Sequence, residues 1–311
     1  MAMEPSPEPE GVEICLDPEG QLLDKRAAHG LDLRALYKKL VAARCLDLRL
    51  SRLALPMWAA SAGEEAVAVI AAMLAGPEDW LYPGPRDLAL APIRGMDLDE
   101  FAQQVLGSTY NGRTGAVAAA DLGIAHAPET LGLQLPLAAG QAHAQKLAGP
   151  GRMTAVLFGE GLTTTGMFHE TVALAVACDL PLVLVCKSAL WPDGAPAEAG
   201  LLGDSVAERV KACGMWSRRV DGADVVSVYA GLEQAFRRAR DGRGPGLIEA
   251  VVTRSEQSPE APAHRDPIER LRRHLDREGV WTPTFQDVIE AEVRGQLERA
   301  FGHALRQEAA T

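Results

Sequence analysis

Short, mostly apolar runs alternate with helical stretches in the second half of the chain, and this alternation constrains the fold more than any other feature. Strands buried on both faces, separated by helices, are typical of a parallel sheet covered on both sides. We therefore predict an α/β fold with a parallel sheet and helices on both faces. The predicted strands are Trp80–Pro83, Met153–Phe158, Leu182–Cys186, Arg218–Val220 and Leu247–Val252, and the helices between the later ones are Gly166–Cys178, Ser205–Cys213 and Ala223–Arg240.

The rest of the chain divides into a lead-in and further helices. Residues 1–30 begin with an acidic, proline-rich stretch that lacks the basic and apolar regions of a signal peptide, so we predict a disordered or extended N-terminal lead-in. Residues 31–311 are predicted to form a single domain. Apolar residues at helical spacing predict helices at Leu31–Leu55, Leu98–Leu106, Leu135–Leu147, Pro267–Glu278 and Phe285–Arg306.

Two segments in the first half have less regular patterns. Ser61 and Glu64 have the spacing of a capping box, which predicts that Ser61 caps the helix that follows. Residues 107–130 are rich in Gly and Ala and lack periodicity. We expect a long ordered loop there, which is uncommon enough to suggest a binding role.

Composition excludes several classes of function. The chain of 311 residues carries 31 basic and 42 acidic residues, a net charge of −11, and such a chain is a poor ligand for nucleic acid. Its longest apolar run, Leu180–Cys186, is too short to span a membrane. The five cysteines are odd in number and show no Cys-x-x-Cys spacing, so we expect reduced thiols and a cytoplasmic location.

One strand–turn–helix unit, Val156–Glu170, is the strongest candidate for chemistry. Gly159 and Gly161 flank Glu160 where the strand ends, and ligands of open α/β sheets bind at that edge. A plain tight turn is the alternative interpretation. A carboxylate beside a phosphate requires a cation between them, which favours Mg²⁺. Further ligands would come from the end of the next strand, around Cys186–Trp191.

Several motifs, in the same order, give the chain a family resemblance. It resembles the alpha subunit of the thiamine-diphosphate-dependent decarboxylating component of 2-oxo acid dehydrogenases, of the pyruvate, branched-chain or acetoin type. The resemblance covers roughly residues 31 to 275. It is carried by Ser61–Ala66, Asp79–Asp87, Gly112–Arg113, Gln134–Pro136, Gly159–Glu170, Val220–Asp224 and Gly244–Ala250.

The resemblance implies cofactors, partners and site residues. The cofactors would be thiamine diphosphate and Mg²⁺, and the partners a beta subunit in an α₂β₂ heterotetramer and a lipoyl-bearing acyltransferase. Glu160 would be the metal ligand. The cofactor-binding positions would be Arg86 for the diphosphate, Leu131 for main-chain contact with the aminopyrimidine, and Gly159, Gly161 and Leu162 at the phosphate turn.

The sequence departs from the family pattern at these same positions. Glu160 stands where the family has Asp, and Ala189, which has no side-chain oxygen, stands where the family has a metal-binding Asn. Pro85 replaces the Tyr before Arg86. The two active-site histidines fall on alanines, Ala118 and Ala261. His264, in the same loop as Ala261, is the candidate substitute and the one predicted catalytic residue.

These departures leave three hypotheses open. The chain is an active alpha subunit, a non-catalytic, cofactor-poor alpha-like subunit that pairs with or regulates a beta subunit, or an enzyme with another ligand on the same scaffold. If the metal is lost, Lys187 near Glu160 would be expected to supply the positive charge in its place.

Overall fold

The fold is built on five parallel strands in the order β1-β2-β3-β5-β4. In this computed structural model the described residues are 11–53, 55, 58–110, 117–127, 130–189, 205–256 and 260–308. Every pairing in the sheet is parallel, which confirms the predicted fold class. The strands are β1 (Trp80–Tyr82), β2 (Thr154–Gly159), β3 (Leu182–Ala189), β4 (Trp216–Asp221) and β5 (Gly246–Val252).

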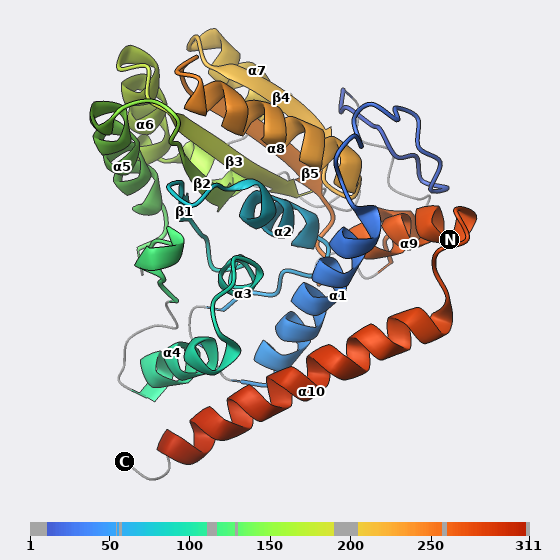
Figure 1. Ribbon diagram of the computed structural model, residues 1–311. Coiled ribbons are helices and arrows are strands. Elements are labelled where there is room, and N and C mark those ends of the chain that lie inside the picture. The colour runs from blue at the N-terminus through green and yellow to red at the C-terminus, as the bar shows by residue number, and fades with distance from the viewer. Residues whose placement is uncertain are drawn as a thin grey trace.

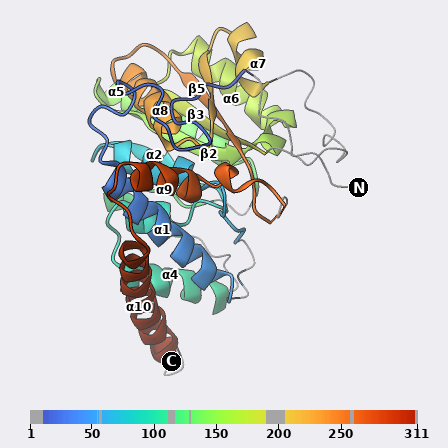
Figure 2. The same cartoon turned by 90° about the vertical axis from the view of Figure 1, so that its right-hand side faces the viewer.

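Helices cover both faces of the sheet (Figure 1). One face packs against α5 (Gln134–Ala148), α6 (Gly166–Ala177) and α7 (Val206–Ala212). The other packs against α2 (Glu65–Leu74) and α8 (Val225–Arg240). Beyond α2 a helical layer extends away from the sheet, as Figure 2 shows. It comprises α1 (Leu33–Leu50), α3 (Leu90–Ile93), α4 (Leu98–Tyr110), α9 (Pro267–Arg277) and α10 (Pro283–Glu308).

The strands divide their side chains between two cores. Along β3, Val183 and Val185 belong to the core on the α2 and α8 face. Leu184 and Cys186 belong to the core on the α5 and α6 face. This is the alternation that a pleated strand imposes, and it places Lys187 on the α2 face and Ser188 on the other.

Several helix boundaries differ from the predicted ones. Helix α1 begins at Leu33 because the Asp32 side chain accepts hydrogen bonds from the N–H groups of Arg34 and Ala35. The capping-box prediction was wrong. No side chain caps α2, because the Glu64 carboxylate that would complete the box instead binds Lys187 and Arg254.

The segment predicted as a long loop is partly helical. Helix α4 continues to Tyr110, and Ala120–Leu122 forms a 3₁₀ helix, η1. Ile124 pairs with Leu81 of β1, so this part of the chain runs beside the sheet edge. Residues 111–116, which include the predicted motif Gly112–Arg113, and residues 128–129 lie outside the described part of the chain.

The segment before α1 lies against the sheet. Glu13 forms a parallel bridge with Val220 of β4, and the Leu16 side chain is fully buried. The Asp224 carboxylate, which also caps α8, accepts the N–H groups of Cys15 and Leu16 at 2.5 and 2.7 Å. Residues 1–10 of the predicted lead-in lie outside the described residues. No helix in the described part of the chain is long and apolar enough to cross a membrane.

Candidate functional site

The predicted strand–turn–helix unit is present at the carboxyl edge of the sheet. Strand β2 ends at Gly159, and a 3₁₀ helix, η2 (Glu160–Thr164), leads into α6. The Thr165 hydroxyl caps α6 by accepting the Phe168 N–H at 3.4 Å. A Cβ on Gly161 would meet no atom of the described residues within 4 Å. The ligand-binding roles of Gly159 and Gly161 stay predictions.

The Glu160 carboxylate pairs with Arg254, which follows strand β5. The two terminal nitrogens of Arg254 lie 3.5 and 3.2 Å from the two Glu160 oxygens. Arg254 also donates through Nε to Glu64. All three side chains are buried. One guanidinium therefore bridges two carboxylates, one from the start of α2 and one from the turn after β2.

Lys187 serves a different pair of carboxylates. Its Nζ lies 2.7 Å from Glu64 Oε2 and 2.8 Å from Asp87 Oδ1, and all three groups are almost fully buried. The expectation that Lys187 supplies the positive charge opposite Glu160 was wrong, because Lys187 points to the α2 face and Arg254 occupies that role.

The charges in this cluster hold one another in their ionised forms. Burial disfavours the charged forms of Lys187 and Arg254, yet the adjacent carboxylates outweigh it and raise the pKa of both groups. Burial would likewise raise the pKa of Glu64, but Lys187 and Arg254 together lower it. These pairings therefore favour the ionised forms of Glu64, Lys187 and Arg254 at neutral pH. The ionic network of Glu64, Asp87, Glu160, Lys187 and Arg254 is called the edge cluster below.

The end of β3 supplies little to a cation. Ala189 is its last residue, and the Ser188 hydroxyl donates to Glu249 at 3.0 Å on the far face. Among the described residues, no group of three or more His, Cys, Asp and Glu side chains has the arrangement of a metal site. Residues 190–204, including Trp191 of the predicted ligand segment, lie outside the described part of the chain.

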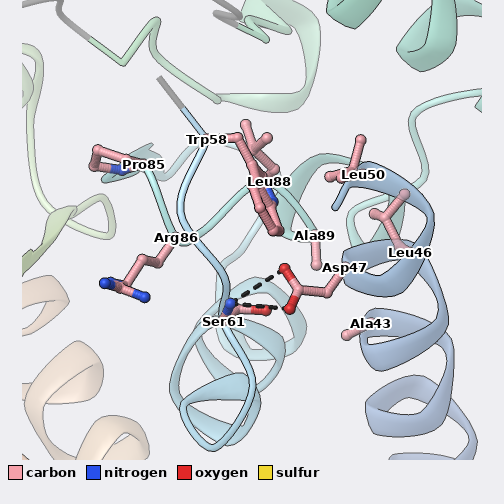
Figure 3. A pocket seen from close by; sticks show the side chains of 10 residues that line it. All are labelled: Ala43, Leu46, Asp47, Leu50, Trp58, Ser61, Pro85, Arg86, Leu88 and Ala89. Carbon is pink, nitrogen blue, oxygen red and sulfur yellow. Dashed lines mark hydrogen bonds between the residues drawn. The ribbon is translucent and has the colours of Figure 1, made fainter. Parts of the chain in front are cut away.

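Arg86, the predicted diphosphate ligand, lies beside the edge cluster. Its Nη1 donates to the Ala60 carbonyl and lies 3.7 Å from Glu256 Oε2. Figure 3 shows its guanidinium pointing away from Asp47, whose two oxygens each accept the Ser61 N–H at 3.1 Å. The cavity between these residues, about 10 Å³, has room for roughly one water.

The other predicted site residues lie in different environments. The Leu162 side chain is buried in the core beneath α6, whereas Leu131 is 59% exposed. His264 is half-buried in a 3₁₀ helix, η3 (Ala263–Arg265). That helix borders a cavity of about 200 Å³, which Ala261 also lines. The catalytic role of His264 stays a prediction.

Sequence reasoning missed the roles of Glu64, Asp87 and Arg254. Arg254 is 94 residues from Glu160 and 190 from Glu64, so no local motif connects them. One signal was available. Arg254 follows the buried strand β5 as Glu160 follows β2, and the carboxyl ends of parallel strands share one edge.

Comparison with known proteins assigns the chain to a family. Residues 42–311 match the model of the dehydrogenase E1 component. The alpha subunit of 3-methyl-2-oxobutanoate dehydrogenase from Mycobacterium tuberculosis is 29% identical over 290 residues, 86% of this chain and 78% of that protein. The pyruvate dehydrogenase E1 component subunit alpha from Acholeplasma laidlawii is 27% identical over 288 residues, 86% and 82% of the two chains.

A third relative is more similar over a shorter stretch. The alpha subunit of acetoin:2,6-dichlorophenolindophenol oxidoreductase from Bacillus subtilis is 34% identical over 199 residues, 62% of this chain and 60% of that protein. The family model covers the whole sheet and the turn at Glu160, which confirms the resemblance drawn from the motifs. This chain belongs to the dehydrogenase E1 component family, among relatives that are alpha subunits.

Proposed function

We propose that this chain is the alpha subunit of a 2-oxo acid dehydrogenase E1 component. The reaction would be oxidative decarboxylation of a pyruvate-like 2-oxo acid with thiamine diphosphate, the cofactor that the family implies. The acyl group would pass to a lipoyl-bearing acyltransferase. The observation that carries the proposal is the turn at Gly159–Gly161, where η2 begins without a side-chain cap at the carboxyl edge of a parallel sheet, a place that favours an anionic ligand.

The side chains beside the turn support an anionic ligand better than a metal. Arg86 is partly exposed, and a guanidinium can bind a diphosphate through two hydrogen bonds. Among the described residues, the Mg²⁺ that the resemblance implies finds no matching donor set, because Glu160 pairs with Arg254 and Ala189 has no side-chain oxygen. No step of the reaction is therefore assigned to a metal-bound cofactor.

Exposed leucines on and just before α5, and on α6, support pairing with a beta subunit and are called the apolar surface below. They are between 38% and 78% exposed, and exposed apolar side chains that adjoin one another are typical of interaction sites. They are Leu131 and Leu133 just before α5, Leu137 and Leu147 within it, and Leu174 on α6.

Co-expression with a beta-like chain tests the proposal. We expect the two chains to purify together and to reduce an artificial electron acceptor when a 2-oxo acid is supplied. Leu137→Asp should weaken co-purification, since it places a charge in the apolar surface. Val288→Asp is the matched control, because Val288 is 59% exposed on α10, which packs on α1 and α4 instead. Failure of the wild-type chains to associate would contradict the proposal.

A second candidate function is a non-catalytic alpha-like subunit that stabilises or regulates a beta subunit. The pairing of Glu160 with Arg254 favours it, together with Ala118 and Ala261 at the histidine positions. Titration of the assembled complex with thiamine diphosphate by calorimetry separates the two. Saturable heat with turnover supports the active subunit, whereas assembly without heat or turnover supports the second candidate.

A further inference from the structure

The edge cluster joins five elements of the fold through ion pairs. Glu64 precedes α2, Asp87 follows β1, Glu160 follows β2, Lys187 lies on β3 and Arg254 follows β5. Each of these residues is buried, with its exposed fraction no higher than 8%. Buried charges of this kind persist only when they are paired, so the geometry of the cluster is a fixed part of the fold.

The position of Arg254 decides what the turn can bind. Its guanidinium is bidentate toward Glu160, with one nitrogen near each carboxylate oxygen, and its Nε is bonded to Glu64. A divalent cation on Glu160 would stand beside this guanidinium and be repelled by it. Arg254 cannot turn away freely, because the same movement would leave Glu64 with Lys187 as its remaining cation in this cluster.

Among the described residues, the opposite wall of the turn offers no compensating ligand. Gly159 pairs with Lys187 in the sheet register, and Ala189 ends the strand two residues later. The hydroxyl of Ser188, the nearest side-chain oxygen on β3, is directed to Glu249 on the other face. Mg²⁺ requires near-octahedral oxygen ligands, and this donor set does not fit it.

We propose that Arg254 is a built-in counter-cation at Glu160, and that this turn binds no divalent metal ion even when a diphosphate ligand is present. The role that a metal bridge would have at the turn is then held by a side chain of the protein. The inference rests on the contacts of the edge cluster and does not depend on association with a beta subunit.

Titration of the full-length chain with Mn²⁺, followed by the paramagnetic resonance of free Mn²⁺, tests this with thiamine diphosphate present. We expect the wild-type chain to retain no stoichiometric Mn²⁺ and Glu160→Gln to behave identically. Glu170→Gln, which alters an exposed carboxylate on the following helix, controls for weak surface binding. Retention of one Mn²⁺ per chain that Glu160→Gln abolishes and Glu170→Gln preserves would overturn the proposal.

A gain-of-binding variant tests whether Arg254 is the group that excludes the metal ion from Glu160. Ala189→Asn supplies an oxygen at the strand end, and Arg254→Gln releases Glu160. We expect the double variant to acquire one Mn²⁺ per chain and Ala189→Asn alone to acquire none. A folded double variant without bound Mn²⁺ would count against Arg254 as the excluding group. If the double variant does not fold, the Glu160→Gln comparison decides alone. Loss of partner association leaves these outcomes unchanged and would refute only the proposed function.

Discussion

Gly63 lies directly against the backbone of Thr253, so closely that a Cβ on Gly63 would stand 1.9 Å from the Thr253 carbonyl oxygen. This contact brings the loop before α2 to the end of β5 and thereby places Glu64 beside Arg254. Gly63 also has a positive φ of +95°, which favours glycine.

Gly63→Ala should therefore lower the free energy of unfolding by more than the cost of placing an alanine at a positive φ, because the new Cβ also clashes with Thr253. Gly95→Ala is the control, because Gly95 has a φ of +104° but no atom lies within 4 Å of the position that a Cβ would take. We expect Gly95→Ala to cost about 1–2 kcal/mol, and Gly63→Ala about 1–3 kcal/mol more from the steric clash. Urea unfolding measures both. Equal costs for the two variants would show that the contact is relieved easily.

Removal of the Lys187 charge should destabilise the fold strongly. Lys187→Met removes the Lys187 partner of Asp87 and leaves Glu64 with one of its two cationic partners, Arg254. Breaking a buried pair costs about 3–5 kcal/mol. The control is Lys211→Met, whose exposed pair with Glu208 contributes about 0–1 kcal/mol. Thermal unfolding distinguishes them. A loss at Lys187 as small as that at Lys211 would mean that the cluster contributes little to stability.

Arg270 and Asp221 form a second buried pair, 2.7 Å apart, in which neither side chain is exposed. Arg270 also donates to the carbonyl of Asp17. We expect Asp221→Asn to cost about 3–5 kcal/mol and to increase hydrogen exchange at the Cys15 and Leu16 amides. The control, Glu233→Gln in an exposed pair with Arg237, should change neither quantity. Unchanged hydrogen exchange in Asp221→Asn would show that the Arg270–Asp221 pair does not hold the segment before α1 in place.

Asp47 should make stability depend on pH. Burial raises the pKa of this carboxyl, and the Ser61 N–H only partly offsets it. Because the folded-state pKa lies above the ordinary value, the charged form is unfavourable in the folded protein at neutral pH. The contribution of Asp47 to the free energy of unfolding therefore increases as the pH falls from the folded-state pKa to the ordinary pKa of an aspartate.

Asp47→Asn should accordingly stabilise the protein at neutral pH, with a gain that vanishes in acid, since both side chains are then uncharged. Asp47→Ala removes the acceptor for the Ser61 N–H and should cost about 1–3 kcal/mol. Urea unfolding at neutral and acidic pH measures both. A gain in Asp47→Asn that persists undiminished in acid would contradict the assignment.

The sheet could be predicted because its strands follow simple burial rules. Met153–Phe158 and Leu247–Val252 were placed within one or two residues of β2 and β5. Strand β3 was predicted to end at Cys186, but it continues to Ala189. Apolar patterns cannot anticipate this extension, because Lys187 is a residue type that is seldom buried and is buried here only through two distant carboxylates.

The position of the turn in the candidate site was predictable, whereas its ionic contacts were not. Backbone geometry places the turn at Gly159–Gly161, and local residue types indicate it. The choice between Lys187 and Arg254 as the partner of Glu160 depends on which face of the sheet each side chain reaches. Strand length and register fix which face each side chain reaches. The sequence pattern predicts the end of β3 only to within a few residues, so it does not determine this face.

The anchoring of the segment before α1 has a consequence for biosynthesis. Cys15 and Leu16 bind Asp224, which is more than 200 residues later, and the Leu16 carbonyl binds Arg270, 254 residues later. During translation this early segment therefore emerges long before its partners. The segment stays undocked, and accessible to proteases and chaperones, until most of the chain has been made. Its docking is therefore one of the last steps of folding on the ribosome.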